Sequence, residues 1–114
     1  MSFPIAQISV EELALRLAES DGTLQLIDVR EPEEIAIAYI EGFAVLSLSQ
    51  FPVWSAEIAT RFDPAAETLV ICHHGVRSAQ MCHWLQNNGF TNVKNIVGGI
   101  EAYACSVDPS IPRY

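Results

Sequence analysis

A single cysteine stands where an apolar segment meets a loop that leads into a helix. The segment reads Cys72-His73-His74-Gly75-Val76-Arg77-Ser78; residues 69–71 before it are apolar, and helical spacing begins at about Ser78. A cysteine in such a turn faces backbone N–H groups and the positive end of a helix dipole, which favour the thiolate and can hold an anion. Arg77 adds a positive charge in the same loop. The pattern predicts a nucleophilic site at Cys72; the alternative is a buried strand cysteine followed by an ordinary polar loop.

A second pair of charged residues follows another apolar segment. Asp28 and Arg30 lie at the end of the predicted strand 24–29. Because ligands bind beyond the carboxyl ends of the strands in open parallel sheets, we expect both residues at the same edge of the sheet as Cys72. The sequence leaves two alternatives open: Arg30 helps to attract a substrate anion, or Asp28 and Arg30 form an ion pair that supports the loop.

Apolar segments typical of strands alternate with segments of helical spacing. The predicted strands are 24–29, 44–48, 68–71 and 93–97. The first predicted helix is capped by Ser9-Val10-Glu11-Glu12 and ends at Asp21-Gly22. The second spans 32–38, and the third contains Trp54 and Ile58. The fourth spans 78–88 and is closed by Gly89, and the fifth spans 100–104. This alternation predicts one α/β domain over residues 1–114, with a parallel sheet of four to five short strands flanked by helices on both faces.

Composition restricts the class of protein. Half of the 114 residues are hydrophobic, which suits one compact core. The net charge of −8 argues against nucleic acid and anionic membrane as partners. The N-terminal residues have no basic region and no long apolar run, and no apolar stretch is long enough to span a bilayer, so we expect neither a signal peptide nor a membrane segment. Three cysteines without a disulfide framework favour a reducing, cytoplasmic location.

Several residues around the cysteine have the chemistry of metal ligands. They are Cys72, His73, His74, Cys82 and His83. Neighbouring residues rarely aim at one ion, and no Cys-x-x-Cys or His-x-x-x-His spacing occurs, so we predict no metal site and no cofactor. His73 and His74 are then loop residues that point to solvent, or groups that recognise an acceptor or move a proton.

Three motifs together resemble those of rhodanese-like domains in order and spacing. They are Ile27-Asp28-Val29-Arg30-Glu31-Pro32-Glu33-Glu34, the loop 72–78, and Val97-Gly98-Gly99-Ile100. The resemblance runs from about Val10 to the last residues of the chain. Two stretches differ from the usual family pattern. Tyr39-Ile40-Glu41-Gly42-Phe43 replaces a stretch that often begins with histidine, and Tyr103-Ala104-Cys105-Ser106, which we interpret as surface variation, replaces a tryptophan and charged residues.

The resemblance implies a single-domain enzyme of the thiosulfate sulfurtransferase type. Cys72 would accept a sulfur atom as a persulfide, and Asp28 would support the site. The residues that would bind the substrate are His73, His74, Gly75, Val76, Arg77, Ser78 and, at the neighbouring strand end, Arg30. The partners would be a small anionic sulfur donor and a thiol or cyanide acceptor, or an acceptor protein.

The length of the loop separates two chemistries of this fold. Four residues lie between Cys72 and Arg77, whereas the cysteine phosphatases and arsenate reductases related to this fold have five; Ser78 stands at the position of their arginine. The shorter loop suits a sulfane sulfur better than a tetrahedral oxyanion. We therefore expect sulfur transfer from thiosulfate or a similar donor to a thiophilic acceptor through a Cys72 persulfide. The alternative is a sulfur-relay, binding or regulatory module that acts with a partner protein.

Overall fold

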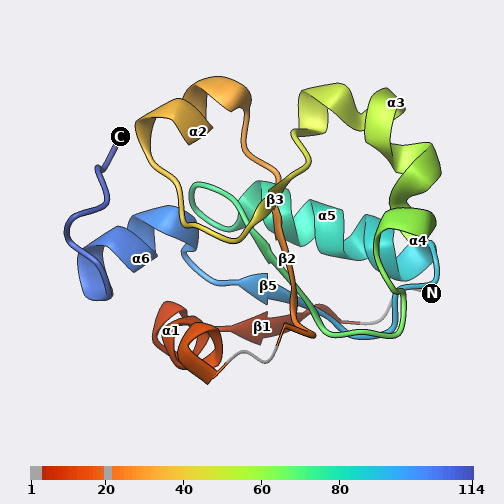
Figure 1. The fold of residues 1–114 in the computed structure, drawn as a ribbon, viewed down its shortest axis with the longest axis horizontal. Coiled ribbons are helices and arrows are strands. Elements are labelled where there is room, and N and C mark those ends of the chain that lie inside the picture. The colour runs from red at the N-terminus through yellow and green to blue at the C-terminus, as the bar shows by residue number, and fades with distance from the viewer. Residues whose placement is uncertain (1–3, 20–21) are drawn as a thin grey trace.

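Strands and helices alternate along the computed structural model, which describes residues 4–19 and 22–114 (Figure 1). The strands are β1 (Ala6–Ile8), β2 (Gln25–Asp28), β3 (Ala44–Val45), β4 (Thr68–Ile71) and β5 (Val93–Ile96). The helices are α1 (Val10–Glu19), α2 (Pro32–Ile37), α3 (Phe51–Trp54), α4 (Ile58–Arg61), α5 (Val76–Asn87) and α6 (Gly99–Ser106), with 3-10 turns η1 (Leu48–Gln50) and η2 (Ser55–Glu57). The strands form one parallel sheet in the order β1-β5-β4-β2-β3, which confirms the predicted α/β class.

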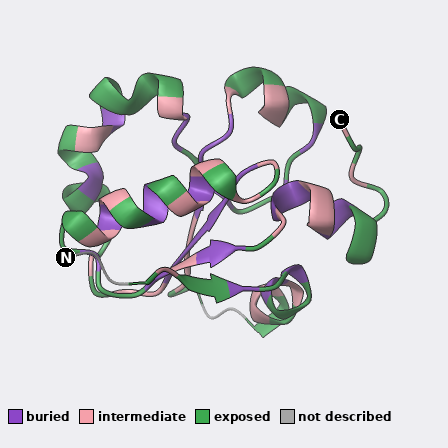
Figure 2. Cartoon of the chain, turned by 180° about the vertical axis from the view of Figure 1, so that it is seen from behind, coloured by how far each residue is buried: buried purple, intermediate pink, exposed green. Residues whose placement is uncertain are grey.

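The central strand β4 divides the core into two layers. All four of its residues are buried; Leu69 and Ile71 pack on one face of the sheet, whereas Val70 and the following Cys72 pack on the other. Successive side chains of a strand point to opposite faces, so a strand covered on both sides is apolar throughout. Helices α1 and α6 supply the first layer, and α3, α4 and α5 supply the second. Figure 2 shows the buried residues gathered in the central strands and on the facing sides of the helices.

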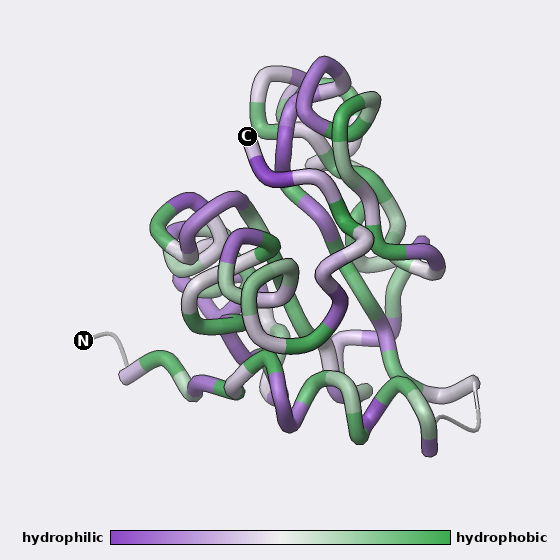
Figure 3. Tube along the Cα trace, turned by 90° about the vertical axis from the view of Figure 1, so that its left-hand side faces the viewer, coloured by the Kyte–Doolittle hydropathy of each residue, from purple (hydrophilic) through white to green (hydrophobic). Residues whose placement is uncertain are grey.

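Helix α1 begins as its sequence predicts. Glu12 N donates to Ser9 Oγ at 3.1 Å, which satisfies one of the free N–H groups of the first turn. The predicted stop at Asp21 lies outside the described residues. Around the helices hydrophobic and hydrophilic stretches alternate (Figure 3), as expected of helices with one buried side.

Several boundaries differ from the prediction. Strand β1 was not predicted; it has three residues, two of them exposed, and it lies at the edge of the sheet. The predicted strand 44–48 is only two residues long, because the chain turns into η1 at Leu48. The helix expected around Trp54 and Ile58 is divided into the short segments η1, α3, η2 and α4. Helix α5 begins at Val76 rather than Ser78, because Gly75 adopts φ +103° and ends the loop there.

One interpretation of the C-terminal region is wrong. Tyr103 and Ala104, which the sequence suggested as surface variation, are buried on α6. Tyr103 packs in the same layer as α1, together with Ile100, because residues three positions apart share one face of a helix. In the stretch 39–43, Ile40 and Phe43 are buried as well, and the Tyr39 hydroxyl donates to the Phe43 carbonyl at 2.6 Å.

Candidate functional site

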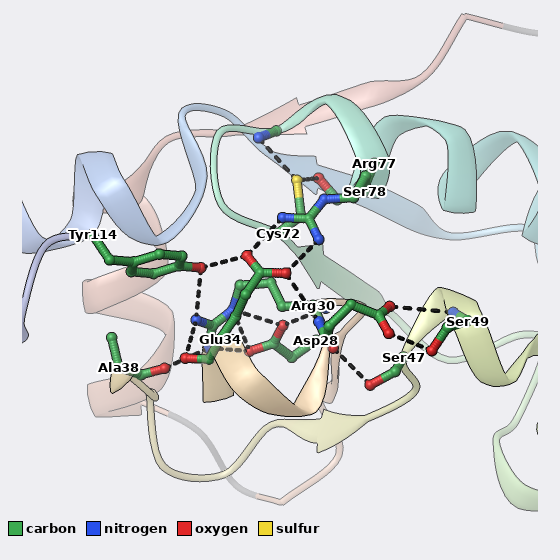
Figure 4. Close-up of polar contacts among 12 residues, drawn as sticks. Asp28, Arg30, Glu34, Ala38, Ser47, Ser49, Cys72, Arg77, Ser78 and Tyr114 are labelled. Carbon is green, nitrogen blue, oxygen red and sulfur yellow. Dashed lines mark hydrogen bonds and ion pairs between the residues drawn. The ribbon is translucent and has the colours of Figure 1, made fainter. Parts of the chain in front are cut away.

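Cys72 comes directly after β4, at the carboxyl edge of the sheet. Cys72 is only 1 % exposed, and its sulfur faces the start of α5 (Figure 4). Gly75 N donates to Cys72 Sγ at 3.0 Å, and Ser78 Oγ lies 3.3 Å from the same sulfur. Ser78 Oγ also lies within hydrogen-bond distance of Asn95 Oδ1, and its single proton can serve only one of the two acceptors at a time. The sulfur therefore has one fixed donor and one shared donor.

The loop is held from behind by its carbonyl oxygens. Ile100 N donates to the Cys72 carbonyl at 2.9 Å, and Glu101 N donates to the His73 carbonyl at 3.1 Å. Asn95 Nδ2 donates to the Gly75 carbonyl at 3.0 Å. These carbonyls are thus occupied by donors from α6 and Asn95, while the Gly75 N–H donates to the sulfur, an arrangement that suits negative charge there.

Helix α6 approaches the loop closely enough to require glycine at its first residue. A Cβ at Gly99 would lie 2.3 Å from the Cys72 carbonyl oxygen and 2.4 Å from that of His73, well inside contact distance. Gly99 also adopts φ +60°. The motif 97–100 therefore positions the loop, which explains why these glycines accompany Cys72 in the sequence.

Arg77 lies in the first turn of α5, not in the loop, and its charge is already paired. Its Nη1 and Nη2 atoms donate to the two carboxylate oxygens of Glu34 on α2, at 2.6 and 2.9 Å. Figure 4 shows the guanidinium of Arg77 between Cys72 and the Glu34 carboxylate. Hydrogen bonds from Arg77 lower the pKa of Glu34 to about 2, so this carboxylate is charged at neutral pH, and those to Glu34 raise the pKa of Arg77. The positive charge expected near the sulfur is thus accompanied by a negative one.

Glu34 also binds two other donors. Glu31 N donates to Glu34 Oε1 at 3.0 Å, and the Tyr114 hydroxyl donates to Oε2 at 2.7 Å. Sequence reasoning missed the contact with Arg77. Glu33 and Glu34 stand side by side at the start of a short helix, and only the path of α2 decides which of them faces α5.

Arg30 lies below this ion pair and is completely buried. Its guanidinium donates to the Asp28 carboxylate at 2.8 to 3.1 Å, and to the Ala38 carbonyl at 2.8 Å. Burial acts to lower the pKa of Arg30, but the hydrogen bonds to Asp28 and Tyr114 together outweigh it and raise the pKa. Asp28 and Arg30 thus form the ion pair that one of the two alternatives expected, and its role in supporting the loop stays a prediction. Contact of Arg30 with a substrate anion stays a prediction, and its burial does not favour it.

The two histidines of the loop differ in their surroundings. The His73 ring stacks on Tyr114, with centroids 3.9 Å apart and planes at 7°, and His74 lies against its other side at 3.9 Å. His73 Nε2 is buried and has no hydrogen-bond partner within the described ranges. Burial lowers the pKa of His73, so it stays neutral at physiological pH. His73 therefore does not point to solvent, whereas His74 and Val76 are exposed at the rim.

The predicted site residues thus form two groups. Cys72, Gly75 and Ser78 meet at the sulfur, and Arg77 stands beside them with Glu34. Asp28 and Arg30 lie deeper, under α2. Sequence reasoning also missed Tyr114, Asn95 and the N–H groups of α6, because their contacts span many residues of chain.

Two further observations concern clusters of metal ligands and helices that could cross a membrane. Within residues 4–19 and 22–114, no three or more side chains of the types His, Cys, Asp and Glu gather as metal ligands. In the same residues, no helix has the length and apolar character needed to cross a membrane.

Comparisons with known proteins find relatives in one family. Residues 9–105 match the Rhodanese-like domain family. The chain is 48 % identical over 97 % of its length to the Rhodanese-like/PpiC domain-containing protein 12, chloroplastic, of Arabidopsis thaliana, of which it spans only 38 %. It is 32 % identical to the thiosulfate sulfurtransferase GlpE of Pseudomonas putida, over 81 % of this chain and 79 % of that protein. A solved structure of a rhodanese-like domain protein from Staphylococcus aureus superposes with a TM-score of 0.77 at 28 % identity, over 96 % of this chain and 99 % of that one.

Proposed function

Because this chain belongs to the rhodanese-like domain family, we propose that it is a sulfurtransferase that carries a sulfane sulfur on Cys72 as a persulfide. The donor is thiosulfate or a similar sulfane-sulfur compound, and the acceptor is a thiophile: cyanide, a small thiol or a protein cysteine. The likeness to a thiosulfate sulfurtransferase over most of both chains supports this donor class.

One observation carries the proposal: donors converge on Cys72 Sγ at the concave side of the loop. Negative charge lies on the attacking sulfur and later on the outer sulfur of the persulfide. The Gly75 N–H already donates to Sγ and needs no reorganisation to stabilise charge on the attacking sulfur. A sulfur that accepts preorganised donors is the arrangement expected of a nucleophile that must hold a charged group between two half-reactions.

The two half-reactions balance without an oxidant or reductant. Cys72 Sγ, as the thiolate, attacks the outer sulfur of thiosulfate; an Sγ–S bond forms, the S–S bond of the donor breaks, and its electron pair leaves with sulfite. The acceptor then attacks the outer sulfur of the persulfide, and the electron pair of that bond returns to Sγ. A thiolate acceptor becomes a persulfide, and cyanide becomes thiocyanate.

Loop length supports sulfur transfer over phosphoryl transfer. Val76 and Arg77 already belong to α5, so only residues 73–75 form the open turn around the sulfur. Ser78, at the position where a phosphatase loop would need a cation, lies buried against Sγ. We expect no hydrolysis of aryl phosphates by the protein.

Mass spectrometry of the protein after incubation with thiosulfate tests the proposal. One added sulfur atom should appear on the peptide that contains Cys72, and Cys72→Ser should abolish both the adduct and thiosulfate turnover. Cys82→Ser and Cys105→Ser are the matched controls and should keep most of the activity. Turnover that survives in Cys72→Ser would overturn the assignment.

A sulfur relay to a partner protein is the second candidate. The chain spans 38 % of a longer relative, and Val76, on the rim of the site, is 68 % exposed. In a relay the Cys72 persulfide would form readily and would be discharged only slowly by cyanide or small thiols. Fast steady-state turnover with thiosulfate and cyanide would favour the general sulfurtransferase instead.

A further inference from the structure

Every cation that the structure describes near the mouth of the site is already paired. Arg77 binds Glu34, Arg30 binds Asp28, and Arg113 binds Glu101. Glu101 lies in the first turn of α6, and its N–H donates to the His73 carbonyl of the loop. The whole chain carries a net charge of −8. An anionic donor that reaches Cys72 therefore meets no free positive side chain among these residues.

Glu34 is the carboxylate that binds Arg77, whose guanidinium lies beside Cys72 (Figure 4). Its side chain is 19 % exposed and that of Arg77 is 33 % exposed, so the pair borders on solvent, whereas Asp28 and Arg30 do not. Arg77, Tyr114 and Glu31 N all donate to it, which fixes its position. The Arg77 guanidinium lies between Cys72 and the Glu34 carboxylate, so negative charge that develops at the sulfur shares this guanidinium with Glu34 (Figure 4).

We propose that Glu34 is a donor-selecting residue, which makes the site discriminate against a small dianion such as thiosulfate and favours the persulfide of a thiol. This inference rests on the proposed sulfurtransferase function. A dianion must share the Arg77 guanidinium with a carboxylate that is already bound to it, and both of its charges are repelled by Glu34. A persulfide, R–S–S⁻, brings one charge, located on the sulfur that enters the N–H-lined turn. The persulfide half-reaction is otherwise the same: Sγ attacks the outer sulfur and the thiolate R–S⁻ leaves.

The test compares two donors on two matched variants. The donors are thiosulfate and the persulfide of 2-mercaptoethanol, whose only charge is on sulfur. Glu34→Gln removes the carboxylate, and Glu33→Gln, on the same helix at an exposed position, makes the same change in net charge away from the ion pair. We expect Glu34→Gln to raise kcat/KM for thiosulfate about fivefold, mainly through KM, as a partly exposed charge interaction allows. In Glu34→Gln, kcat/KM for the persulfide should stay within about twofold of the wild-type value. Glu33→Gln should change kcat/KM for neither thiosulfate nor the persulfide.

Several outcomes overturn the inference. If Glu34→Gln changes kcat/KM for both donors by the same factor, Glu34 only supports the fold or orients Arg77. If thiosulfate turnover falls while persulfide turnover holds, Glu34 assists the dianion. If neither donor places sulfur on Cys72 of the wild-type protein, the proposed function itself fails, which is a separate result.

A measurement on the wild-type protein covers the case in which Glu34→Gln does not fold. Salt screens a repulsive carboxylate, with a Debye length of about 8 Å at physiological ionic strength. The ratio of kcat/KM for thiosulfate to that for the persulfide should therefore rise with added sodium chloride. A ratio that falls with salt would mean that the mouth attracts the dianion, against the proposal.

Discussion

Two hydrogen-bond donors face the sulfur of Cys72, and they differ in what else they bind. Gly75 N donates to Sγ at 3.0 Å from a backbone position fixed by the Asn95–Gly75 contact. Ser78 Oγ divides its proton between Sγ and Asn95 Oδ1. The serine hydroxyl can turn toward the sulfur when the sulfur is charged, whereas the glycine amide already points there in this structure.

Ser78→Ala should therefore slow the formation of the persulfide without abolishing it. The loss of one hydrogen bond to a charged sulfur corresponds to a decrease of roughly tenfold in the single-turnover rate with either donor. Ser110→Ala, which removes an exposed hydroxyl bound to Asp108, is the matched control and should leave the rate unchanged. An unchanged rate in Ser78→Ala would mean that its proton remains with Asn95 throughout the reaction.

Cys82 should be inert in the folded protein. It is fully buried on α5, and burial raises the pKa of its thiol to about 12, so almost none of it is thiolate at neutral pH. Iodoacetamide should label exposed Cys105 while the Cys82 peptide stays unmodified, as followed by mass spectrometry. The protein unfolded in guanidinium chloride is the control and should be labelled at both. Equal labelling of Cys82 and Cys105 in the native protein would show that α5 opens readily.

At the scale of elements, the sequence predicted best what short-range patterns determine. The apolar run 68–71, the proline and glutamates at 32–34 and the glycine after 78–88 mark β4, α2 and the end of α5 correctly, because their signals lie within one turn or one strand. Strand β1 was missed because it has three residues and an exposed outer edge, so no apolar run marks it. The division of 48–61 was missed because Trp54 and Ile58 are four residues apart whether or not the helix is continuous.

The candidate site was predictable only to the extent that it lies in one segment. Cys72, Gly75 and Ser78 are within seven residues of one another, so the sequence placed them together. The pairing of Arg77 with Glu34 spans 43 positions and the contact of Tyr114 with Glu34 spans 80. Such contacts depend on how α2, α5 and the C-terminal segment pack against one another, and no local sequence pattern predicts this packing.

Gly99→Ala should disrupt the site through the packing of α6 on the loop. The added methyl would meet the carbonyl oxygens of Cys72 and His73, so the loop must move and its N–H groups lose their aim at the sulfur. We expect a loss of about 2 kcal/mol or more in the free energy of unfolding and of most persulfide formation.

Gly89→Ala is the matched control for this change. Gly89 also has a positive φ, +92°, but a Cβ there would meet nothing within 4 Å. Gly89→Ala should lower the free energy of unfolding by about 1–2 kcal/mol, from backbone strain alone, and should leave the activity per folded molecule unchanged. Denaturant unfolding and single-turnover kinetics measure the two effects separately. Equal losses of activity in both variants would show that strain in the backbone, not the approach of α6, explains the result.

At the scale of the whole molecule, the C-terminal segment returns to the site from the far end of α6 (Figure 1). Tyr114 stacks on His73, donates to Glu34 and accepts a hydrogen bond from Arg30 Nη1 at 3.1 Å. Burial raises the pKa of Tyr114 to about 12, so its hydroxyl keeps its proton and remains a donor to Glu34. One side chain thus ties together the loop, α2 and the buried ion pair.

A second cluster of charges lies at the end of β4 opposite to Cys72. Glu67, directly before β4, binds Arg16 of α1 and Lys94 of β5; Arg16 Nη1 donates to Glu67 Oε2 at 2.9 Å. The hydrogen bond from Arg16 has the largest effect on the pKa of Glu67. Together with the one from Lys94 it lowers this pKa from 4.5 to about 2. The carboxylate therefore stabilises the folded state fully above about pH 4.5, and this stabilisation is lost as the pH falls toward 2.

Glu67→Gln tests this pH dependence. At neutral pH the variant should be less stable than the wild-type protein by about 1–2 kcal/mol, a value reduced from the full shift because Arg16 and Lys94 are each about a third exposed. The difference should shrink between pH 4.5 and 2, since protonation removes the same charge from the wild-type protein. Urea unfolding over this range measures it, with exposed Glu57→Gln as the control. A difference that stays constant with pH would show that the contacts of Glu67 stabilise the fold through packing rather than through its charge.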